Sequence, residues 1–157
     1  MTDTLNEQVG VLTRREIEAR ALKPFFEAVA AELGEDKTRA LLREVVVTAA
    51  KDAGAAMRTR AEGDGLEAFA AQWEPWFRGG ALEIDELERT EEVWAFNVTR
   101  CRYAELYRAL GMADLGATLS CNRDAALIEG YSDEVAFERT QTLMAGSGYC
   151  DFRYRKK

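Results

Sequence analysis

Residues 93–111, VWAFNVTRCRYAELYRALG, contain the change of hydrophobic period that decides the fold. Large apolar side chains at Trp94, Phe96 and Val98 alternate with smaller or polar neighbours, which predicts a half-buried strand. From about residue 102 the spacing becomes helical, and Gly111 is a typical helix end. The stretch therefore predicts a strand that is followed at once by a helix.

The same two periods recur on both sides of this stretch. Before it, Leu82 and Ile84 begin a candidate strand, and residues 89–91 are expected to form the hairpin turn. After it, a second helical segment covers about residues 113–129. The chain then returns to strand-like alternation, first at Val135, Phe137, Arg139 and Gln141 and then at Cys150, Phe152 and Tyr154. Residues 80–157 thus predict the order strand, strand, helix, helix, strand, strand.

Residues 1–79 carry helical signals instead. Thr13 and Glu16 fit a capping box at the start of a first helix. Pro24 is expected to end that helix and to begin another, because proline is tolerated in a first turn but not in a helix interior. Further helices are expected at about residues 36–62, which should form the main core helix, and at residues 66–77.

Helices first and strands later favour an α+β fold in a single domain, residues 1–157. We expect N-terminal helices packed with a C-terminal antiparallel sheet of about four strands, which is interrupted by two helices. A chain of 157 residues with 47% hydrophobic residues is long and apolar enough to bury a core. We interpret Trp73 and Trp76 as exposed aromatic residues, so the sequence does not exclude a homodimer.

Charge and hydropathy exclude several classes of partner. The net charge of −7 argues against nucleic acid, since phosphate binding needs clustered Lys and Arg. No apolar run approaches the roughly 18 residues that a membrane span requires, and the first ten residues lack the pattern of a signal peptide. The expectation is a cytoplasmic protein with neither a nucleic-acid nor a membrane partner.

The chain has no histidine, so any nucleophile or soft metal ligand must come from its three cysteines, Cys101, Cys121 and Cys150. An odd number of widely spaced cysteines favours free thiols, a nucleophile or metal ligands over structural disulfides. A zinc or iron ion held by the three thiolates is an alternative, although their spacing matches no standard metal motif. Otherwise no cofactor is expected.

Two carboxylates and one arginine support these thiols. Glu105 and Asp124 each follow a cysteine by about one helical turn, so each carboxylate could exchange a proton with its thiol or with a water. Arg139 lies where the alternation predicts a core-facing side chain, and its charge cannot be lost there. Its partner is either an internal carboxylate, Asp124 or Glu105, or the carboxylate of a ligand.

These residues carry a family resemblance. Residues 97–111, NVTRCRYAELYRALG, and 119–157, LSCNRDAALIEGYSDEVAFERTQTLMAGSGYCDFRYRKK, resemble the L-2-amino-thiazoline-4-carboxylic acid hydrolase family. Its C-terminal signature has a Cys opening a Tyr-containing helix that ends at Gly, then Cys-x-x-Asp, an Arg-Thr strand and Gly-x-x-x-Cys-Asp-Phe. The matching positions are Cys101, Tyr103, Gly111, Cys121, Asp124, Arg139, Thr140, Gly146, Cys150, Asp151 and Phe152.

The resemblance implies hydrolysis of a small cyclic amidine-like ring, in which a nucleophile adds to the carbon between sulfur and nitrogen and the carbon–sulfur bond then breaks. The named enzyme converts its thiazoline to N-carbamoyl-L-cysteine. One of the three cysteines is expected to be the nucleophile, with Cys101 or Cys121 preferred over Cys150, and Asp124 or Glu105 would move protons. Arg139 would clamp the substrate carboxylate, and Tyr103 and Thr140 are further substrate-binding candidates.

Two other functions stay open on this sequence. One is a non-catalytic metal-sensing, redox-sensing or ligand-binding domain that uses the three cysteines. The other is a biosynthetic enzyme that acts on a related amino-acid-derived substrate.

Overall fold

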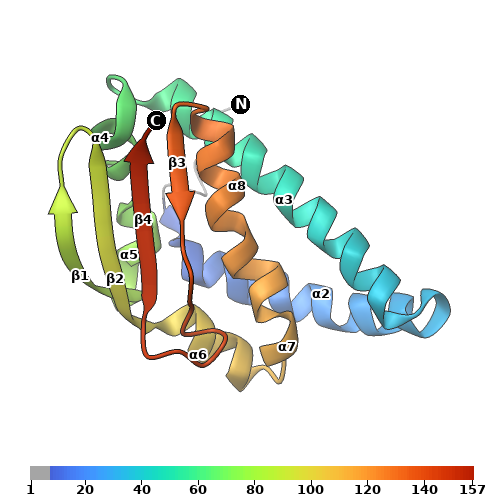
Figure 1. Ribbon diagram of the computed structural model, residues 1–157. Coiled ribbons are helices and arrows are strands. Elements are labelled where there is room, and N and C mark those ends of the chain that lie inside the picture. The colour runs from blue at the N-terminus through green and yellow to red at the C-terminus, as the bar shows by residue number, and fades with distance from the viewer. Residues whose placement is uncertain (1–7) are drawn as a thin grey trace.

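The computed structural model describes residues 8–157, and its elements follow the predicted order of helices first and strands later (Figure 1). The long helices are α2 (Val11–Leu33) and α3 (Glu35–Arg60), followed by the short α4 (Gly65–Ala70), α5 (Glu74–Phe77) and the 3₁₀ turn η1 (Arg78–Gly80). The remaining elements are β1 (Leu82–Arg89), β2 (Val93–Cys101), α6 (Arg102–Ala109), α7 (Ala113–Gly116), the π-helical segment η2 (Ala117–Cys121), α8 (Asn122–Tyr131), β3 (Val135–Glu138) and β4 (Cys150–Lys156).

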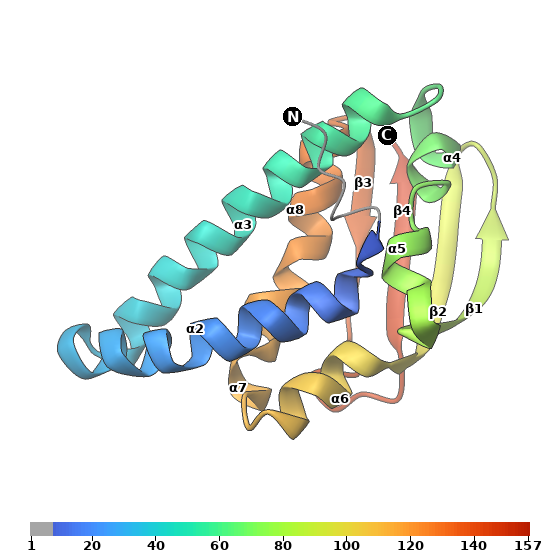
Figure 2. The ribbon, with the colours of Figure 1, turned by 180° about the vertical axis from the view of Figure 1, so that it is seen from behind.

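The four strands form one antiparallel sheet in the order β1-β2-β4-β3. Seen from opposite sides in Figures 1 and 2, α4 and α5 lie against one face of this sheet, and α8 lies beside β3. The α+β class and the sheet of four strands with helices between them are thus confirmed. Residues 93–111 form the predicted strand and helix, β2 and α6, with Cys101 as the junction.

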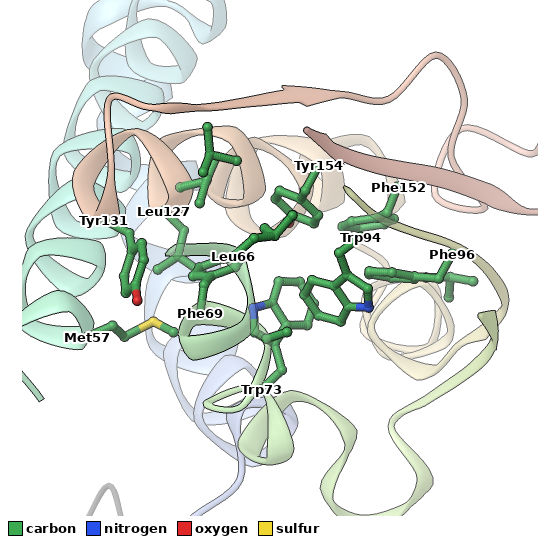
Figure 3. Close-up of a cluster of buried hydrophobic side chains, with 14 of the residues drawn as sticks. Met57, Leu66, Phe69, Trp73, Trp94, Phe96, Leu127, Tyr131, Phe152 and Tyr154 are labelled. Atoms are coloured by element: carbon green, nitrogen blue, oxygen red, sulfur yellow. The ribbon is translucent and has the colours of Figure 1, made fainter. Parts of the chain in front are cut away.

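The covered face of the sheet is aromatic because the register of β2 and β4 places alternate large residues opposite one another. Trp94 pairs with Tyr154 and Phe96 with Phe152, and their rings stack with centroids 5.5 and 4.9 Å apart. Phe69 and Trp73, from the segment of α4, pack edge-on against this layer (Figure 3). Such cross-strand aromatic pairs stabilise a sheet beyond the area that they bury.

Two glycines bring α3 and α8 into close contact. A Cβ added at Gly54 would lie 2.0 Å from the carbonyl oxygen of Leu127, and one added at Gly130 would lie 2.1 Å from that of Lys51. Only a residue without a Cβ fits at either position, so the two backbones approach more closely than ordinary side chains permit. This contact fixes α8 against the longest helix.

Two predictions about the first helix are wrong. The helix begins at Val11, after Gly10, rather than at a capping box formed by Thr13. It also continues through Pro24 to Leu33, where a restart was expected. Ala19 and Phe26 are buried in the same cluster on either side of the proline, so tertiary packing keeps the helix continuous.

Three other element boundaries also differ from prediction. The segment 66–77 is split into α4 and α5, because Pro75 starts a new helix instead of extending the old one. The segment 113–129 is interrupted by the π-helical turn η2. Strand β3 ends at Glu138, since the amides of Thr140 and Gln141 donate to the Asp151 carboxylate instead of continuing the strand.

The two tryptophans that the sequence analysis interprets as exposed, Trp73 and Trp76, are buried and partly buried. Trp73 is 1% exposed, and Trp76 is partly buried and stacked on it. Within residues 8–157, no helix combines the length and apolar character that crossing a bilayer requires.

Candidate active site

A small cavity of about 50 Å³ lies where the covered face of the sheet meets α2, α5, α6 and the start of α8. Its lining combines aromatic and apolar side chains with a set of polar groups. The polar and sulfur-containing residues among them are Arg15, Tyr103, Ser120, Cys121, Arg123, Asp124, Arg139 and Cys150. Two of the three cysteines therefore meet at one cavity with the carboxylate and the arginine that the sequence singled out.

The π-helical turn η2 places Cys121 and Asp124 at this cavity. It ends at Cys121, which is also the N-cap of α8, and Asp124 follows in the first turn of that helix. A π turn holds one more residue than an α turn, so it rotates the side chains that follow it relative to those before it, and such turns are frequent at functional sites.

Arg139 and Asp124 form the internal salt bridge that was one of the two sequence-based alternatives. The guanidinium Nη1 donates to Asp124 Oδ2, and Nη2 donates to the backbone oxygen of Cys121 at 3.1 Å. Both side chains are mostly buried. Burial raises the pKa of Asp124 and the attraction of Arg139 opposes the rise only in part, so the carboxylate is a stronger base than an exposed one.

A second charged group, which the sequence analysis missed, borders the same cavity through Arg15 and Arg123. Arg15 from α2 is bound to Glu18 at 2.8 Å, and Arg123 Nη2 donates to the same carboxylate at 3.3 Å. Burial and the repulsion of Arg15 lower the pKa of Arg123 to about 10. Together with the Arg139–Asp124 pair, this gives three guanidinium groups and two carboxylates, a cluster with one surplus positive charge.

The thiols differ in their surroundings. Cys101 does not line the cavity: its sulfur accepts a hydrogen bond from the amide of Ala104 at 3.4 Å and caps α6. The Cys150 sulfur accepts from the amide of Leu143 at 3.2 Å. Burial raises the pKa of Cys101 to about 11 and, together with the charge of Asp124, that of Cys121 to about 12; burial also raises the pKa of Cys150. All three are free thiols, as predicted.

The other candidates are placed as follows. The Tyr103 hydroxyl, at the cavity, donates to the backbone oxygen of Trp76 at 3.1 Å, and burial raises its pKa. Glu105 is on the surface, where it binds Arg100 at 2.8 Å, away from the cavity. Thr140 is exposed, and its hydroxyl donates to Asp151 at 2.6 Å.

No group of three or more Cys, Asp or Glu side chains within residues 8–157 is arranged to hold a metal ion. The backbone amides of Ala104 and Leu143 donate to the sulfurs of Cys101 and Cys150. The arrangement instead combines a thiol, a basic carboxylate and an excess of buried guanidinium groups. Such a set can bind a small anion and move a proton beside it.

Comparisons with known proteins agree with the resemblance seen in the sequence. A model of the L-2-amino-thiazoline-4-carboxylic acid hydrolase family matches residues 14–154. No curated protein matches the chain at a significant level.

Two solved structures are similar in part. The phenol-responsive sensory domain of the transcription activator PoxR is 11% identical with a TM-score of 0.48, over 87% of this chain and 73% of that one. A trafficking protein particle complex subunit 3 from Naegleria fowleri, covalently bound to palmitic acid, is 9% identical with a TM-score of 0.47, over 90% of this chain and 96% of that one.

Proposed function

Since the chain belongs to the L-2-amino-thiazoline-4-carboxylic acid hydrolase family, we propose that it hydrolyses a small cyclic amidine carboxylate, such as L-2-amino-thiazoline-4-carboxylate, to an N-carbamoyl amino acid. The observation that carries the proposal is the surplus positive charge beside Cys121 and Asp124. A buried cationic cluster is stabilised by an anionic ligand, and the substrate of this family is a carboxylate.

In the proposed complex, the substrate carboxylate binds Arg123 and Arg15 rather than Arg139. Arg139 is already held by Asp124 and by the backbone of Cys121, and the two cavity arginines share a single carboxylate, Glu18. A bound anion would also relieve the repulsion between Arg15 and Arg123. Arg139 then acts as a positioning residue that keeps Asp124 beside the thiol.

Cys121 is the proposed nucleophile. Its raised pKa means that it is a neutral thiol at pH 7, so it needs a proton acceptor at the moment of attack, and Asp124 is one helical turn away. Asp124 takes the thiol proton as Cys121 sulfur bonds to the ring carbon between sulfur and nitrogen. The ring carbon–sulfur bond then breaks, and the departing sulfur takes the proton from Asp124.

Water completes the reaction. It adds to the carbon now bound to Cys121, that carbon–sulfur bond breaks, and Cys121 regains its proton. The product is a urea, the N-carbamoyl amino acid, with a new free thiol. One water is consumed for each ring opened, and no oxidant or reductant is needed.

The test is turnover of L-2-amino-thiazoline-4-carboxylate, followed by the appearance of a free thiol and by mass spectrometry of N-carbamoyl-L-cysteine. We expect Cys121→Ala to abolish turnover. Asp124→Asn should lower kcat by about 10²–10⁴-fold. Cys101→Ser is the matched thiol variant, and it should stay within a few-fold of the parent because serine can still accept from Ala104.

Two results would overturn this assignment. Full activity of Cys121→Ala would exclude a covalent step at that thiol. Binding of the ring acid without any turnover, by protein purified with or without added zinc or iron, would favour a ligand-binding or sensing domain.

A further inference from the structure

A groove of about 960 Å³ opens from the small cavity and is bordered by α2, α3, the α4–α5 segment and α8. In Figure 2, α2, α3 and α5 lie toward the viewer with α8 behind them. Arg15, Trp76, Arg123 and Asp124 line both spaces, whereas Cys121 lines the cavity and not the groove. The groove therefore reaches the proposed reaction centre from the side of the two cavity arginines.

The groove is positively charged on a protein that is acidic as a whole. Among the described residues, five arginines and three carboxylates line it, which gives a net charge of +2 when all are ionised. The complete chain carries −7. The arginines come from four elements, α2, α3, η1 and α8, and they are Arg14, Arg15, Arg60, Arg78 and Arg123.

The three carboxylates of the groove are already paired with arginines. Glu74 binds Arg78 at 2.6 Å, and Glu18 binds both Arg15 and Arg123. Asp124 is held by Arg139, which lines the cavity and not the groove.

Arg60, in the last turn of α3, has no such partner. Its side chain is exposed, and within residues 8–157 it makes neither an ion pair nor a hydrogen bond. The charge of Arg60 therefore acts into the groove without a neighbouring carboxylate to oppose it.

The orientation of the proposed complex turns the anionic end of the substrate toward this charge. The amidine carbon lies at Cys121 in the inner cavity, and the carboxylate lies on Arg15 and Arg123, where the cavity meets the groove. A substrate that arrives through the groove thus enters with its ring first, and its carboxylate stays on the groove side.

We propose that the groove is the entrance for the substrate and that Arg60 draws the substrate carboxylate toward Arg15 and Arg123. This rests on the proposed function for the identity of the anion. An acidic protein repels an anion at long range, and a cleft lined by the opposite charge overcomes that repulsion by raising the local concentration of the anion and its association rate. Because the charges at the entrance are exposed, salt screens the attraction.

The test measures association of N-carbamoyl-L-alanine, an unreactive carboxylate that resembles the proposed product. Stopped-flow tryptophan fluorescence can follow it, since Trp73 and Trp76 line the cavity. At about 0.1 M salt, Arg60→Glu should lower the association rate constant by at least about threefold and Arg60→Gln by less. At about 1 M salt the variants and the parent should agree within about 1.5-fold. The dissociation rate constant should change less than about twofold, because Arg60 lies outside the inner cavity.

Arg43→Glu is the matched control. It changes the net charge of the protein by the same amount, and Arg43 is exposed on the same helix but does not line the groove. It lies about 26 Å from Arg60 along the axis at 1.5 Å per residue, more than two Debye lengths at about 0.1 M salt. Its association rate constant should stay within about 1.5-fold of the parent.

The outcomes separate this inference from the proposed function. Equal association rates in Arg60→Glu and Arg43→Glu, the same loss in Arg60→Glu at both salt concentrations, or no binding of the anion would overturn the entrance. Turnover of the ring acid would still support the hydrolase in each case. Arg60-dependent association in a protein that opens no ring would count against the hydrolase and support the entrance.

Discussion

Arg139 and Asp124 show that the orientation and the partner of a single side chain can be predicted from the sequence. The alternation around Arg139 predicted an inward side chain, and an arginine that cannot lose its charge requires an acceptor. The structure supplies Asp124, which was one of the two internal candidates. The prediction succeeded because it rests on a local period and on a chemical necessity, neither of which depends on the rest of the chain.

Breaking this pair should destabilise the protein. Asp124→Asn leaves the largely buried Arg139 without its carboxylate, and we expect the free energy of unfolding in urea to fall by about 3 kcal/mol. The double variant Asp124→Asn with Arg139→Gln should recover part of this loss, because no uncompensated charge then remains buried. Additive losses in the double variant would contradict the pairing.

Arg15 and Arg123 illustrate what a residue-by-residue reading misses. Arg15 belongs to the run TRRE, and the sequence gives no reason to prefer it over Arg14 as the inward side chain. Its ion-pair partner Glu18 lies on the same helix, but Arg123, which donates to the same carboxylate, comes from α8, 105 residues after Glu18. The one available signal was Arg123 in the Cys-Asn-Arg-Asp run, next to a predicted proton acceptor.

At the scale of elements, the position of the candidate site depends on how α8 is held. Its start carries Cys121 and Asp124, the π-helical turn η2 sets their orientation, and its C-terminal half is fixed to α3 by Gly54 and Gly130. The sequence already contained one signal of this close packing, because Gly54 lies inside the helix predicted at about residues 36–62. The π turn had no comparable signal.

Gly54→Ala should therefore be costly. The new Cβ would meet backbone atoms of α8 that cannot rotate away, so the helix must shift, and we expect a loss of about 3 kcal/mol in the free energy of unfolding. Gly148→Ala is the matched control, since no atom lies within 4 Å of its Cβ and its φ is not positive. It should change the stability by less than about 0.5 kcal/mol. Similar losses in both variants would contradict the close approach of α3 and α8.

At the scale of the whole molecule, burial of thiols and phenols makes the fold sensitive to alkali. Burial raises the pKa of Cys101 from 9.0 to about 11, that of Cys121 from 9.0 to about 12 and that of Tyr107 from 10.0 to about 12. Because these pKa values are higher in the folded chain, the stabilisation is fully present below pH 9 and is lost as the pH rises towards 12.

Urea unfolding at two pH values measures this effect. Between pH 8 and pH 10.5, Cys101 and Cys121 should each reduce the free energy of unfolding by about 2 kcal/mol. Cys121→Ala should lose correspondingly less over the same interval. If the variant and the parent lost the same amount, the thiol of Cys121 would not have a raised pKa.

The sequence by itself determined the α+β class, the strand and helix of residues 93–111, the free thiols, the inward Arg139 and the family. These follow from local periods, from the absence of histidine and from motif order, which need no knowledge of distant contacts. Only the tertiary structure decided that Cys121 and Cys150 line the cavity while Cys101 caps a helix, and that Arg15 joins them from the first helix. Such choices depend on packing between segments far apart in the chain, and that packing also keeps α2 continuous through Pro24 against the local preference of proline.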